Sequence, residues 1–277
     1  MEAIKISLDD YVLTGAGGNG ESFCSKSDPD VLLKLYLPGR EGRSVEELSK
    51  ARKVFALGIP TPEPGELVVT EDGRHGILFR RIRDKKSYSR ATADEPGKVA
   101  QYASEFAEMC LQLHGIHVDT SEFESVKDCY YQLLEESPFF TAAEKDKLCR
   151  FIADAPDADT AIHGDLQFSN AIFVADKRYF IDLGDFCYGY RLFDVGMMYL
   201  CCVLSDEPFV KEYFHMPKAL AVRFWEHFAP AYFGTDRPLR DIEEEILPYA
   251  GLKNLIIERD IHAVKPWLRL ALNPILN

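Results

Sequence analysis

The segment Ala161–Asn170 reads AIHGDLQFSN, and Ile181–Asp185 reads IDLGD; together they hold the densest group of polar side chains in an apolar setting. Each segment begins with apolar residues typical of a short strand, so we expect each Asp at a strand end, where side chains can converge. Asp165, Asn170 and Asp182 carry oxygen ligands of the kind that Mg2+ accepts together with phosphates and water. A carboxylate left outside the metal shell could deprotonate a hydroxyl.

The chain ahead of these segments is rich in predicted strands up to about residue 83. Short apolar runs in residues 1–83 are separated by Gly, Pro, Asn and Asp, and one helix is predicted between them over 44–57. Ser44 is the expected N-cap, Glu47 its capping-box partner, and Gly58 the stop signal. The expected strands include Tyr11–Leu13, Val31–Leu37, Leu67–Val69 and Gly76–Ile82.

The rest of the chain is mainly helical by its apolar spacing. Helices are predicted over 96–114, 122–137, 141–154 and 192–204, and over roughly 216–276 with breaks at Pro230, Pro238, Pro248 and Pro266. Short strands are expected at Thr160–His163, Ala171–Val174 and Tyr179–Asp182. We therefore predict an α+β fold with a small β-rich N-terminal lobe, residues 1–83, and a larger, mainly helical C-terminal lobe, residues 84–277. A cleft between such lobes is a common ligand site.

A second group of candidate site residues lies in the predicted N-terminal lobe. Gly15, Gly17 and Gly20 form a Gly-x-Gly-x-x-Gly pattern that lets backbone N–H groups approach phosphates, although three glycines also suit a flexible turn. Lys34 stands within an apolar strand, where burying an unpaired lysine is costly; an edge strand that faces water is the other explanation. Glu47 could hold that lysine or serve only as a capping carboxylate.

The spacing His163-x-Asp165-x-x-x-x-Asn170, followed by Asp182-x-Gly184, resembles the catalytic and metal loops of the protein-kinase-like fold. The form His-Gly-Asp-Leu-x-x-x-Asn, with Ile-Asp-x-Gly-Asp downstream, resembles that of the aminoglycoside phosphotransferase and choline kinase family. The glycine pattern, the strand lysine and a glutamate ahead of a Pro-x-Pro turn agree with that family. The resemblance thus implies a bilobal protein-kinase-like fold.

The resemblance also implies roles for individual residues between 15 and 194. It makes Asp165 the catalytic base, Asn170 and Asp182 the Mg2+ ligands, and Lys34 the phosphate-binding lysine, with Glu47 as its ion-pair partner and Gly15, Gly17 and Gly20 at the nucleotide. Gly189, Arg191 and Asp194 resemble the motif that buttresses the catalytic loop. His163 is expected to brace that loop.

Some positions depart from the protein-kinase pattern. Leu183 stands in place of the metal-loop phenylalanine, and no activation segment ending in Ala-Pro-Glu is visible, which argues against a protein substrate. Arg80 and Arg81 occupy the expected lobe connection, where an acidic residue is commoner in this family. The choice between ATP and GTP as co-substrate therefore stays open.

Composition limits the possible partners. The 277 residues include 45 acidic and 32 basic side chains, a net charge of -13, and 47% of the residues are hydrophobic. These values exclude a disordered chain and argue against a nucleic-acid binder. Residues 1–83 carry 13 acidic and 12 basic side chains, whereas residues 84–277 carry 32 and 20. The acidic part favours a small cationic acceptor, although a solvated acidic surface explains it as well.

Other features concern the compartment. The seven cysteines form no C-x-x-C pair, so free thiols in a reducing cytosol are expected. The N-terminus lacks signal-peptide features, and the longest apolar stretch, Val195–Leu204, is about half of the ~20 residues of a membrane-spanning helix. We expect a cytoplasmic protein that contacts no membrane; the oligomeric state is not predicted.

Three functions compete at this point. The first is a kinase that transfers the γ-phosphate of a nucleoside triphosphate to a hydroxyl of an aminoglycoside-like or other small, cationic acceptor. The second is a metal-dependent phosphoesterase or hydrolase with His163, Asp165 and Asp182 as metal ligands. The third is a nucleotide-binding pseudokinase. The glycine pattern and Lys34 are left unexplained by the second.

Overall fold

The computed structural model describes residues 3–17, 20–261 and 269–277, and the chain folds into two compact units. The first unit comprises Met1–Lys85 and Ile172–Gly184, and the second comprises Lys86–Ala171 and Asp185–Asn277. The first unit thus includes a segment that the sequence analysis placed in the helical lobe. Backbone contacts explain this: Phe180 N donates to Pro60 O at 2.8 Å.

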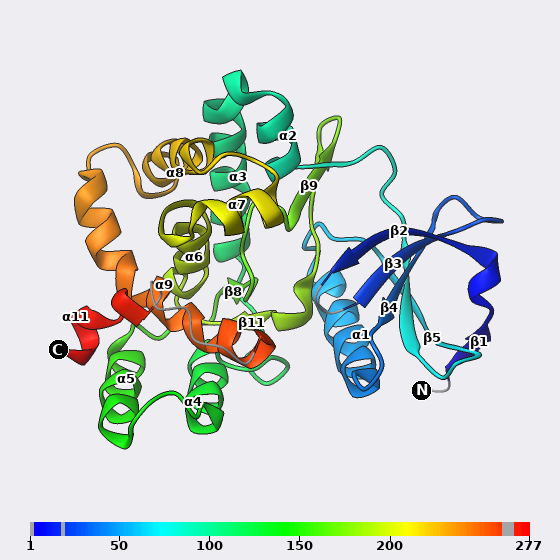
Figure 1. Ribbon diagram of the computed structural model, residues 1–277, viewed down its shortest axis with the longest axis horizontal. Helices are drawn as coiled ribbons and strands as arrows, with labels where there is room; N and C mark the ends of the chain where they lie inside the picture. The colour runs from blue at the N-terminus through cyan, green and yellow to red at the C-terminus, as the bar shows by residue number, and fades with distance from the viewer. Residues whose placement is uncertain (1–2, 18–19, 262–268) are drawn as a thin grey trace. The chain divides into compact units, whose positions relative to one another are not determined.

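A six-stranded sheet forms most of the first unit, in blue to cyan in Figure 1. Its strands are β1 (Ile4–Ile6), β2 (Tyr11–Gly17), β3 (Gly20–Ser25), β4 (Val31–Tyr36), β5 (Pro64–Thr70) and β6 (His75–Arg80), in the order β1-β5-β6-β4-β3-β2. Only β1 runs parallel to its neighbour, β5; the other pairs are antiparallel. The strands β9 (Ala171–Val174) and β10 (Lys177–Phe180) pair separately. The sequence analysis missed β1 and β3, which are short or rich in Gly and Ser.

Alternation along β4 decides which side chains meet the helix α1 (Glu41–Ala56). Leu33 and Leu35 are buried on one face of the sheet, in a cluster with Val68. Tyr36 is buried on the other face, in a cluster with Leu48 of α1. Because side chains on a strand alternate between faces, Lys34 shares the α1 face with Tyr36.

The start of α1 corrects the sequence prediction. The helix begins at Glu41 after Arg40, three residues before Ser44, and no side chain caps it. Ser44 is instead fully buried inside the helix. Glu47 is therefore no capping residue, and its carboxylate is available for other contacts. The predicted end is confirmed, because Gly58 has a φ of 78° and its N–H bonds to Phe55 O.

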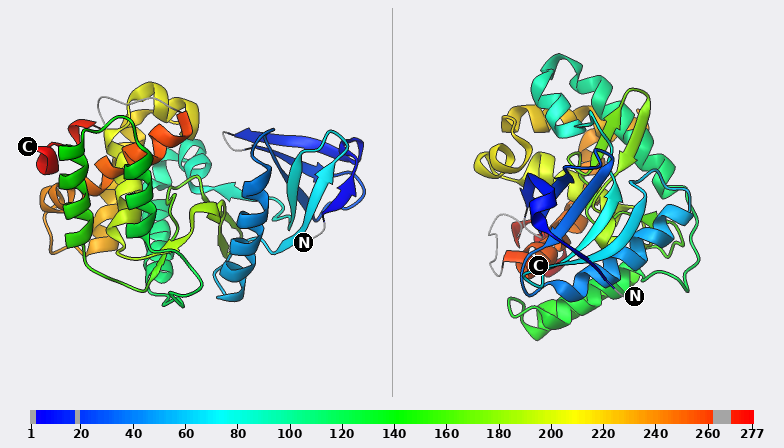
Figure 2. Two further views of the ribbon diagram at one scale, coloured as in Figure 1. Left: turned by 90° about the horizontal axis from the view of Figure 1, so that it is seen from below. Right: turned by 90° about the vertical axis from the view of Figure 1, so that its right-hand side faces the viewer.

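The second unit is mainly helical, and the left view of Figure 2 shows its helices, from the green α4 and α5 to the orange α9. Its elements are β7 (Lys86–Ser87), α2 (Tyr88–Asp94), α3 (Val99–His114), α4 (Val126–Glu136), α5 (Ala142–Asp154), β8 (Ala161–Ile162), β11 (Cys187–Tyr188), α6 (Leu192–Tyr199), α7 (Glu207–Phe214), α8 (Lys218–Phe233), α9 (Leu239–Ile261) and α11 (Asn273–Leu276). The spacing of Thr141 and Glu144 in the sequence predicts a capping box, and this capping box is present at the start of α5. The short α2 was not predicted.

Buried aromatic rings fill the centre of the second unit. Phe106 of α3 packs against Phe224 and Phe228 of α8, with ring centroids 6.2 and 5.7 Å apart. All three rings are fully buried. Helices α3 and α8 are thus held together by apolar burial, which is the main source of stability in a core of this kind.

Two of the four predicted helix breaks are wrong. Pro230 lies within the last turn of α8, and Pro248 lies inside α9. Proline removes one backbone hydrogen bond, but α9 is packed tightly against α6, so tertiary contacts override the local preference. Pro238 does precede a helix start, at Leu239. Pro266 lies outside the described residues.

Two further observations concern membrane-spanning helices and cysteines. Among the residues described, no helix combines the length and the apolar character needed to cross a membrane. All seven cysteines are free thiols.

Candidate active site

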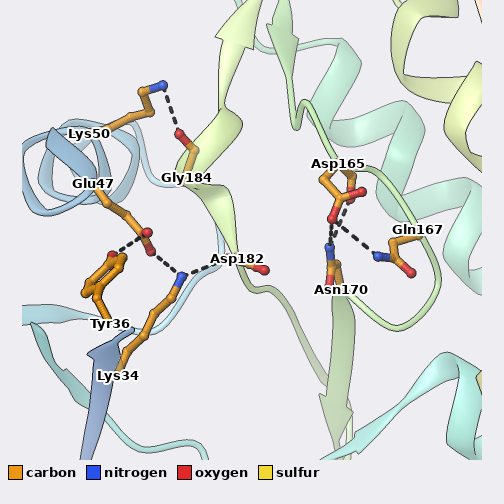
Figure 3. A network of polar contacts seen from close by, with 9 residues as sticks. All are labelled: Lys34, Tyr36, Glu47, Lys50, Asp165, Gln167, Asn170, Asp182 and Gly184. Carbon is orange, nitrogen blue, oxygen red and sulfur yellow. Dashed lines mark hydrogen bonds and ion pairs between the residues drawn. The ribbon is translucent and has the colours of Figure 1, made fainter. Parts of the chain in front are cut away.

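Lys34 is held by two carboxylates within the first unit (Figure 3). Its Nζ lies 2.6 Å from Glu47 Oε1 and 2.8 Å from Asp182 Oδ1. Burial alone would lower the pKa of Lys34, but the charges of Asp182 and Glu47 outweigh burial and raise the pKa well above its ordinary value. Because β4 is an interior strand and the Lys34 side chain is only 19% exposed, the edge-strand explanation is excluded.

Glu47 is fixed by a third group. The Tyr36 hydroxyl donates a short hydrogen bond to Glu47 Oε2, and its ring lies 5.6 Å from Lys34 Nζ. Burial, followed by the charge of Glu47, raises the pKa of Tyr36, so the hydroxyl remains a donor. Both carboxylate oxygens of Glu47 are thus engaged, one by the lysine and one by the tyrosine. The sequence analysis missed Tyr36, although its position two residues after Lys34 on a strand places both on one face.

The segment that carries Asp182 is shaped by its backbone. Asp182 has a φ of 62°, in the left-handed region that Asp adopts more readily than most residues. One turn of α1 beyond Glu47, Lys50 donates to Gly184 O at 2.9 Å. A Cβ at Gly184 would lie 3.2 Å from Glu47 Oε2, so the glycine lets this segment lie close to the helix. These contacts hold the Asp182 carboxylate next to Lys34.

The three predicted loop glycines differ in their surroundings. The strands β2 and β3 pair with each other, with Gly17 opposite Gly20, and residues 18–19 lie outside the described residues. A Cβ at Gly20 would lie 2.3 Å from Leu35 O, so the close approach of β3 to β4 requires glycine there. At Gly15 a Cβ would make only an ordinary contact at 3.9 Å. Contact of these glycines with phosphates stays a prediction.

Asp165 and Asn170 meet within the second unit (Figure 3). Asn170 Nδ2 donates to Asp165 Oδ2 at 2.8 Å and to Asp165 O at 3.0 Å. Gln167 Nε2 lies 3.3 Å from the same Oδ2. The carboxylate of Asp165 is therefore oriented by two side-chain amides from its own loop. Gln167 was not among the predicted site residues.

Apolar side chains anchor this loop in the core. Leu166 and Phe168, on either side of Gln167, are fully buried. The ring of Phe168 packs against Phe214 and Phe224, with centroids 4.7 and 5.0 Å apart. Alternation of buried apolar and half-buried polar residues thus presents Asp165 and Gln167 on one side of the loop. Rigid placement of this kind is what a reacting group needs.

The carboxylate of Asp194 binds the backbone at the start of the loop that carries Asp165. This carboxylate, fully buried, accepts hydrogen bonds from His163 N at 2.6 Å and Gly164 N at 2.9 Å, and from His114 Nε2 at 3.1 Å. Burial would raise the pKa of Asp194, but the hydrogen bond and charge of His114 lower it below its ordinary value. A buried carboxylate that accepts several N–H groups stays ionised. These contacts are the buttress expected of Asp194.

Gly164 is required by the shape of the loop. Its φ is 88°, and a Cβ there would lie 2.1 Å from Asp185 O. The backbone therefore turns sharply just before Asp165, in a conformation that L-residues avoid. The sequence analysis quoted this glycine within the His-Gly-Asp motif but gave it no role.

The predicted site residues divide between the two units. Lys34, Glu47 and Asp182 are in the first unit, with the ion pairs described above, and Asp165 and Asn170 are in the second. The chain joins the two sets directly, because Asn170 is followed by β9, and Asp182 follows β10. Their roles in catalysis and metal binding remain proposals.

No curated protein matches the chain. Among solved structures, a thermostable mutant of the aminoglycoside phosphotransferase APH(4)-Ia, in its apo form, is similar at 14% identity, with 96% of this chain and 94% of that chain covered and a TM-score of 0.64. The amicoumacin kinase hAmiN, in complex with AMP-PNP, Ca2+ and Ami, is similar at 13% identity, with 99% and 88% covered and a TM-score of 0.58.

A choline/ethanolamine kinase family protein from Mesorhizobium loti is similar at 16% identity, with 96% of this chain and 85% of that chain covered and a TM-score of 0.53. These likenesses confirm the predicted kinase-like α+β fold. The model of the phosphotransferase enzyme family matches residues 15–229, well over half of the chain. The protein therefore belongs to the phosphotransferase enzyme family.

Proposed function

We propose that this protein is a nucleotide-dependent kinase that phosphorylates a hydroxyl of a small molecule. The observation that carries the proposal is the set of contacts around Lys34, whose Nζ is held 2.6 Å from Glu47 Oε1 and 2.8 Å from Asp182 Oδ1. A half-buried cation held at fixed distance from a carboxylate suits the binding of nucleotide phosphates. Its raised pKa keeps Lys34 charged throughout the physiological range.

The chemistry proposed for Asp165 is acceptance of a proton. The hydroxyl oxygen of the acceptor forms a bond to the γ-phosphorus, the bond from that phosphorus to the bridging oxygen breaks, and the nucleoside diphosphate leaves. Asp165 takes the hydroxyl proton. The amides of Asn170 and Gln167 support this role, because they orient the carboxylate without removing its charge.

Asn170 and Asp182 are the residues proposed to hold Mg2+. The amide oxygen and the carboxylate are hard oxygen donors of the type that Mg2+ prefers. Asn170 fits the role in this structure: its two hydrogen bonds to Asp165 both use Nδ2, and the acceptor Oδ1 is the amide atom that could bind a metal. When bound, Mg2+ neutralises phosphate charge. ATP and GTP both remain candidate co-substrates.

The proposal for the acceptor, the small molecule that receives the phosphoryl group, rests on solved structures of similar fold. Solved relatives of this fold include a complex of APH(4)-Ia with AMP-PNP and hygromycin B and one of hAmiN with Ami. We propose a small, cationic hydroxyl compound for this chain as well. Two acidic runs of the second unit, Asp206-Glu207 and Glu243-Glu244-Glu245, add no support for a cationic acceptor. Their glutamates pair locally: Glu207 with Lys211, Glu244 with Arg240, Glu245 with Arg237, and Glu243 with the Trp225 N–H.

The metal-dependent hydrolase alternative finds little support. Three or more His, Cys, Asp or Glu side chains grouped to hold a metal ion do not occur among the described residues. His163, a ligand in that alternative, is fully buried. The pseudokinase alternative differs from the kinase only in turnover, so an activity measurement separates them.

A nucleotide-consumption screen tests the proposal. The protein is incubated with Mg2+ and either ATP or GTP, together with aminoglycosides, amino alcohols or sugars, and the acceptors are analysed by mass spectrometry. We expect one acceptor class to gain a single phosphoryl group. Nucleotide binding without transfer to any acceptor would favour the pseudokinase, and phosphate release from simple esters without nucleotide would favour the hydrolase.

The Asp165→Asn variant checks the mechanism. We expect its turnover of the identified acceptor to fall by about 100-fold or more, since a general base contributes that much. Its melting temperature and nucleotide affinity should stay close to wild type, because Asp165 is half-buried and lies outside the Lys34 cluster. Full turnover in this variant would show that Asp165 is not the base.

A further inference from the structure

Lys253 is a buried lysine that neither the family motifs nor the proposed mechanism uses. It lies in α9 and is 1% exposed. An ammonium group is almost never buried without a partner, because removing its charge from water is costly. Polar groups of the second unit that contact the Lys253 ammonium must therefore explain its burial.

The reason is a contact with the loop that carries Asp165. Lys253 Nζ donates to Gly164 O at 3.0 Å. The N–H of the same glycine is held by Asp194 Oδ1 at 2.9 Å. Gly164 is thus held on both sides, by an anion at its N–H and by a cation at its C=O. Its φ of 88° makes it the point where the backbone turns into Asp165.

The charges of this arrangement balance inside the core. Burial would lower the pKa of Lys253, but neighbouring groups, Tyr130 and Asp194 first among them, raise it above its ordinary value. The Tyr130 ring also lies 5.6 Å from Lys253 Nζ. Lys253 is therefore a cation that binds the C=O of Gly164, while the buried carboxylate of Asp194 binds the N–H of the same glycine.

We propose that Lys253 is a positioning residue that fixes the Gly164–Asp165 peptide and thereby aims the Asp165 carboxylate. The C=O that it binds belongs to the peptide bond directly before Asp165, so rotation of that planar peptide would change the φ of Asp165 and move its N atom, on which the direction of the Cα–Cβ bond depends. The part concerned with Asp165 as a base rests on the proposed function. The part concerned with the peptide rests on the contacts alone.

Hydrogen–deuterium exchange tests the peptide without requiring activity. In Lys253→Met, which keeps the length of the side chain but not its charge, we expect several-fold faster exchange in the fragment covering residues 161–168. Exchange elsewhere in the chain should match wild type. Lys127→Met is the matched control, since Lys127 also donates to a backbone carbonyl, Ala153 O at 3.1 Å, in another part of the unit. If the 161–168 fragment of Lys253→Met exchanges as in wild type, the inference is wrong.

Kinetics test the consequence for Asp165. We expect Lys253→Met to lower kcat by about tenfold or more. The KM for nucleotide should change by less than about twofold, because the residues proposed to bind the nucleotide keep their contacts in this variant. Faster exchange with an unchanged kcat would overturn the positioning role. If wild type shows no transfer in any screen, the proposed function fails, and the exchange result still decides whether Lys253 holds the peptide.

The variant Lys253→Arg distinguishes loss of the contact with Gly164 O from a general folding defect caused by Lys253→Met. It keeps the cation and its donors, so exchange in the 161–168 fragment should return toward the wild-type rate and kcat should recover in part. Equal loss in both variants, with a lowered melting temperature, would point to a packing role for this position and contradict the inference.

Discussion

At the residue scale, Glu47 is the side chain whose contacts matter most in the first unit. One oxygen accepts from Lys34 and the other from Tyr36, so the carboxylate cannot rotate without losing one of the two. A hydrogen bond to a charged group contributes about 1.5–3 kcal/mol. Tyr36 should therefore matter to nucleotide binding although it need not touch the nucleotide.

Tyr36→Phe tests this role. We expect the free energy of unfolding to fall by about 1.5–3 kcal/mol, because Glu47 loses one partner. We also expect the KM for nucleotide to rise several-fold, because Glu47 then holds Lys34 less firmly. Tyr102→Phe is the matched control: its hydroxyl donates to Glu95 Oε1 at 2.9 Å in the second unit. Equal effects on nucleotide KM in both variants would contradict the prediction.

Asp194 leads to a prediction about pH. Its pKa in the folded chain is lowered, so its contribution to stability is fully present above the unfolded pKa of about 3.9 and is lost as pH falls toward the folded pKa. Wild type should thus be more stable than Asp194→Asn at pH 6, and the difference should shrink as pH falls below about 4. Urea unfolding of both proteins, from pH 6 down to about pH 2.5, measures this difference across the range in which Asp194 becomes protonated. A difference that is constant with pH would contradict the assigned pKa direction.

At the element scale, the contact of α6 with α9 shows how tertiary packing overrides sequence signals. Gly196 of α6 lies against the backbone of α9, where an added Cβ would be 2.8 Å from Ala250 N. Pro248, predicted to end a helix, lies two residues before that contact and inside α9. The tight packing of these helices holds α9 continuous through the proline.

Gly196→Ala tests that packing. Alanine is favoured over glycine in a helix, yet we expect a loss of about 1–3 kcal/mol in the free energy of unfolding, because the extra methyl overpacks the contact. Gly97→Ala is the control, since a Cβ at Gly97 has nothing within 4 Å. Thermal unfolding of both variants gives the comparison. A Gly196→Ala protein as stable as wild type would show that the helices separate at little cost.

At the scale of the whole molecule, the chain passes between the two units three times, after Lys85, Ala171 and Gly184. The formal charge divides unevenly between them: 16 acidic and 15 basic side chains in the first unit, 29 and 17 in the second. The nearly neutral unit is the one with the proposed phosphate-binding lysine. A polyanionic ligand meets less repulsion there than it would in the acidic unit.

A nucleotide should therefore stabilise the whole protein. At about 100 times its Kd, a ligand adds ~2.7 kcal/mol to the free energy of unfolding, so the melting temperature should rise by several degrees with ATP or GTP and Mg2+. Lys34→Met should lose most of this rise. If that variant is stabilised as much as wild type, Lys34 does not bind the phosphates.

The sequence predicts the local features of this protein well. The strand around Lys34, the stop at Gly58 and the capping box at Thr141 depend on residues close in the chain, and the structure confirms each. The helix start at Ser44 and the breaks at Pro230 and Pro248 were wrong, because burial of helix faces against distant elements outweighs a single local signal.

The residues of the candidate site also divide into those that the sequence identifies and those that only the tertiary structure shows. The sequence identified Lys34, Glu47, Asp165, Asn170 and Asp182 as candidates, through their residue types and through the resemblance of their motifs to those of the kinase-like family. Only the tertiary structure added Tyr36 and Lys253 as partners of that machinery. The local sequence offers one signal for Tyr36, its place two residues after Lys34 on the same strand. It offers none for Lys253, because a lysine in a helix is an ordinary residue until folding buries it. The cost of burying a polar group without a partner is then what makes each contact necessary.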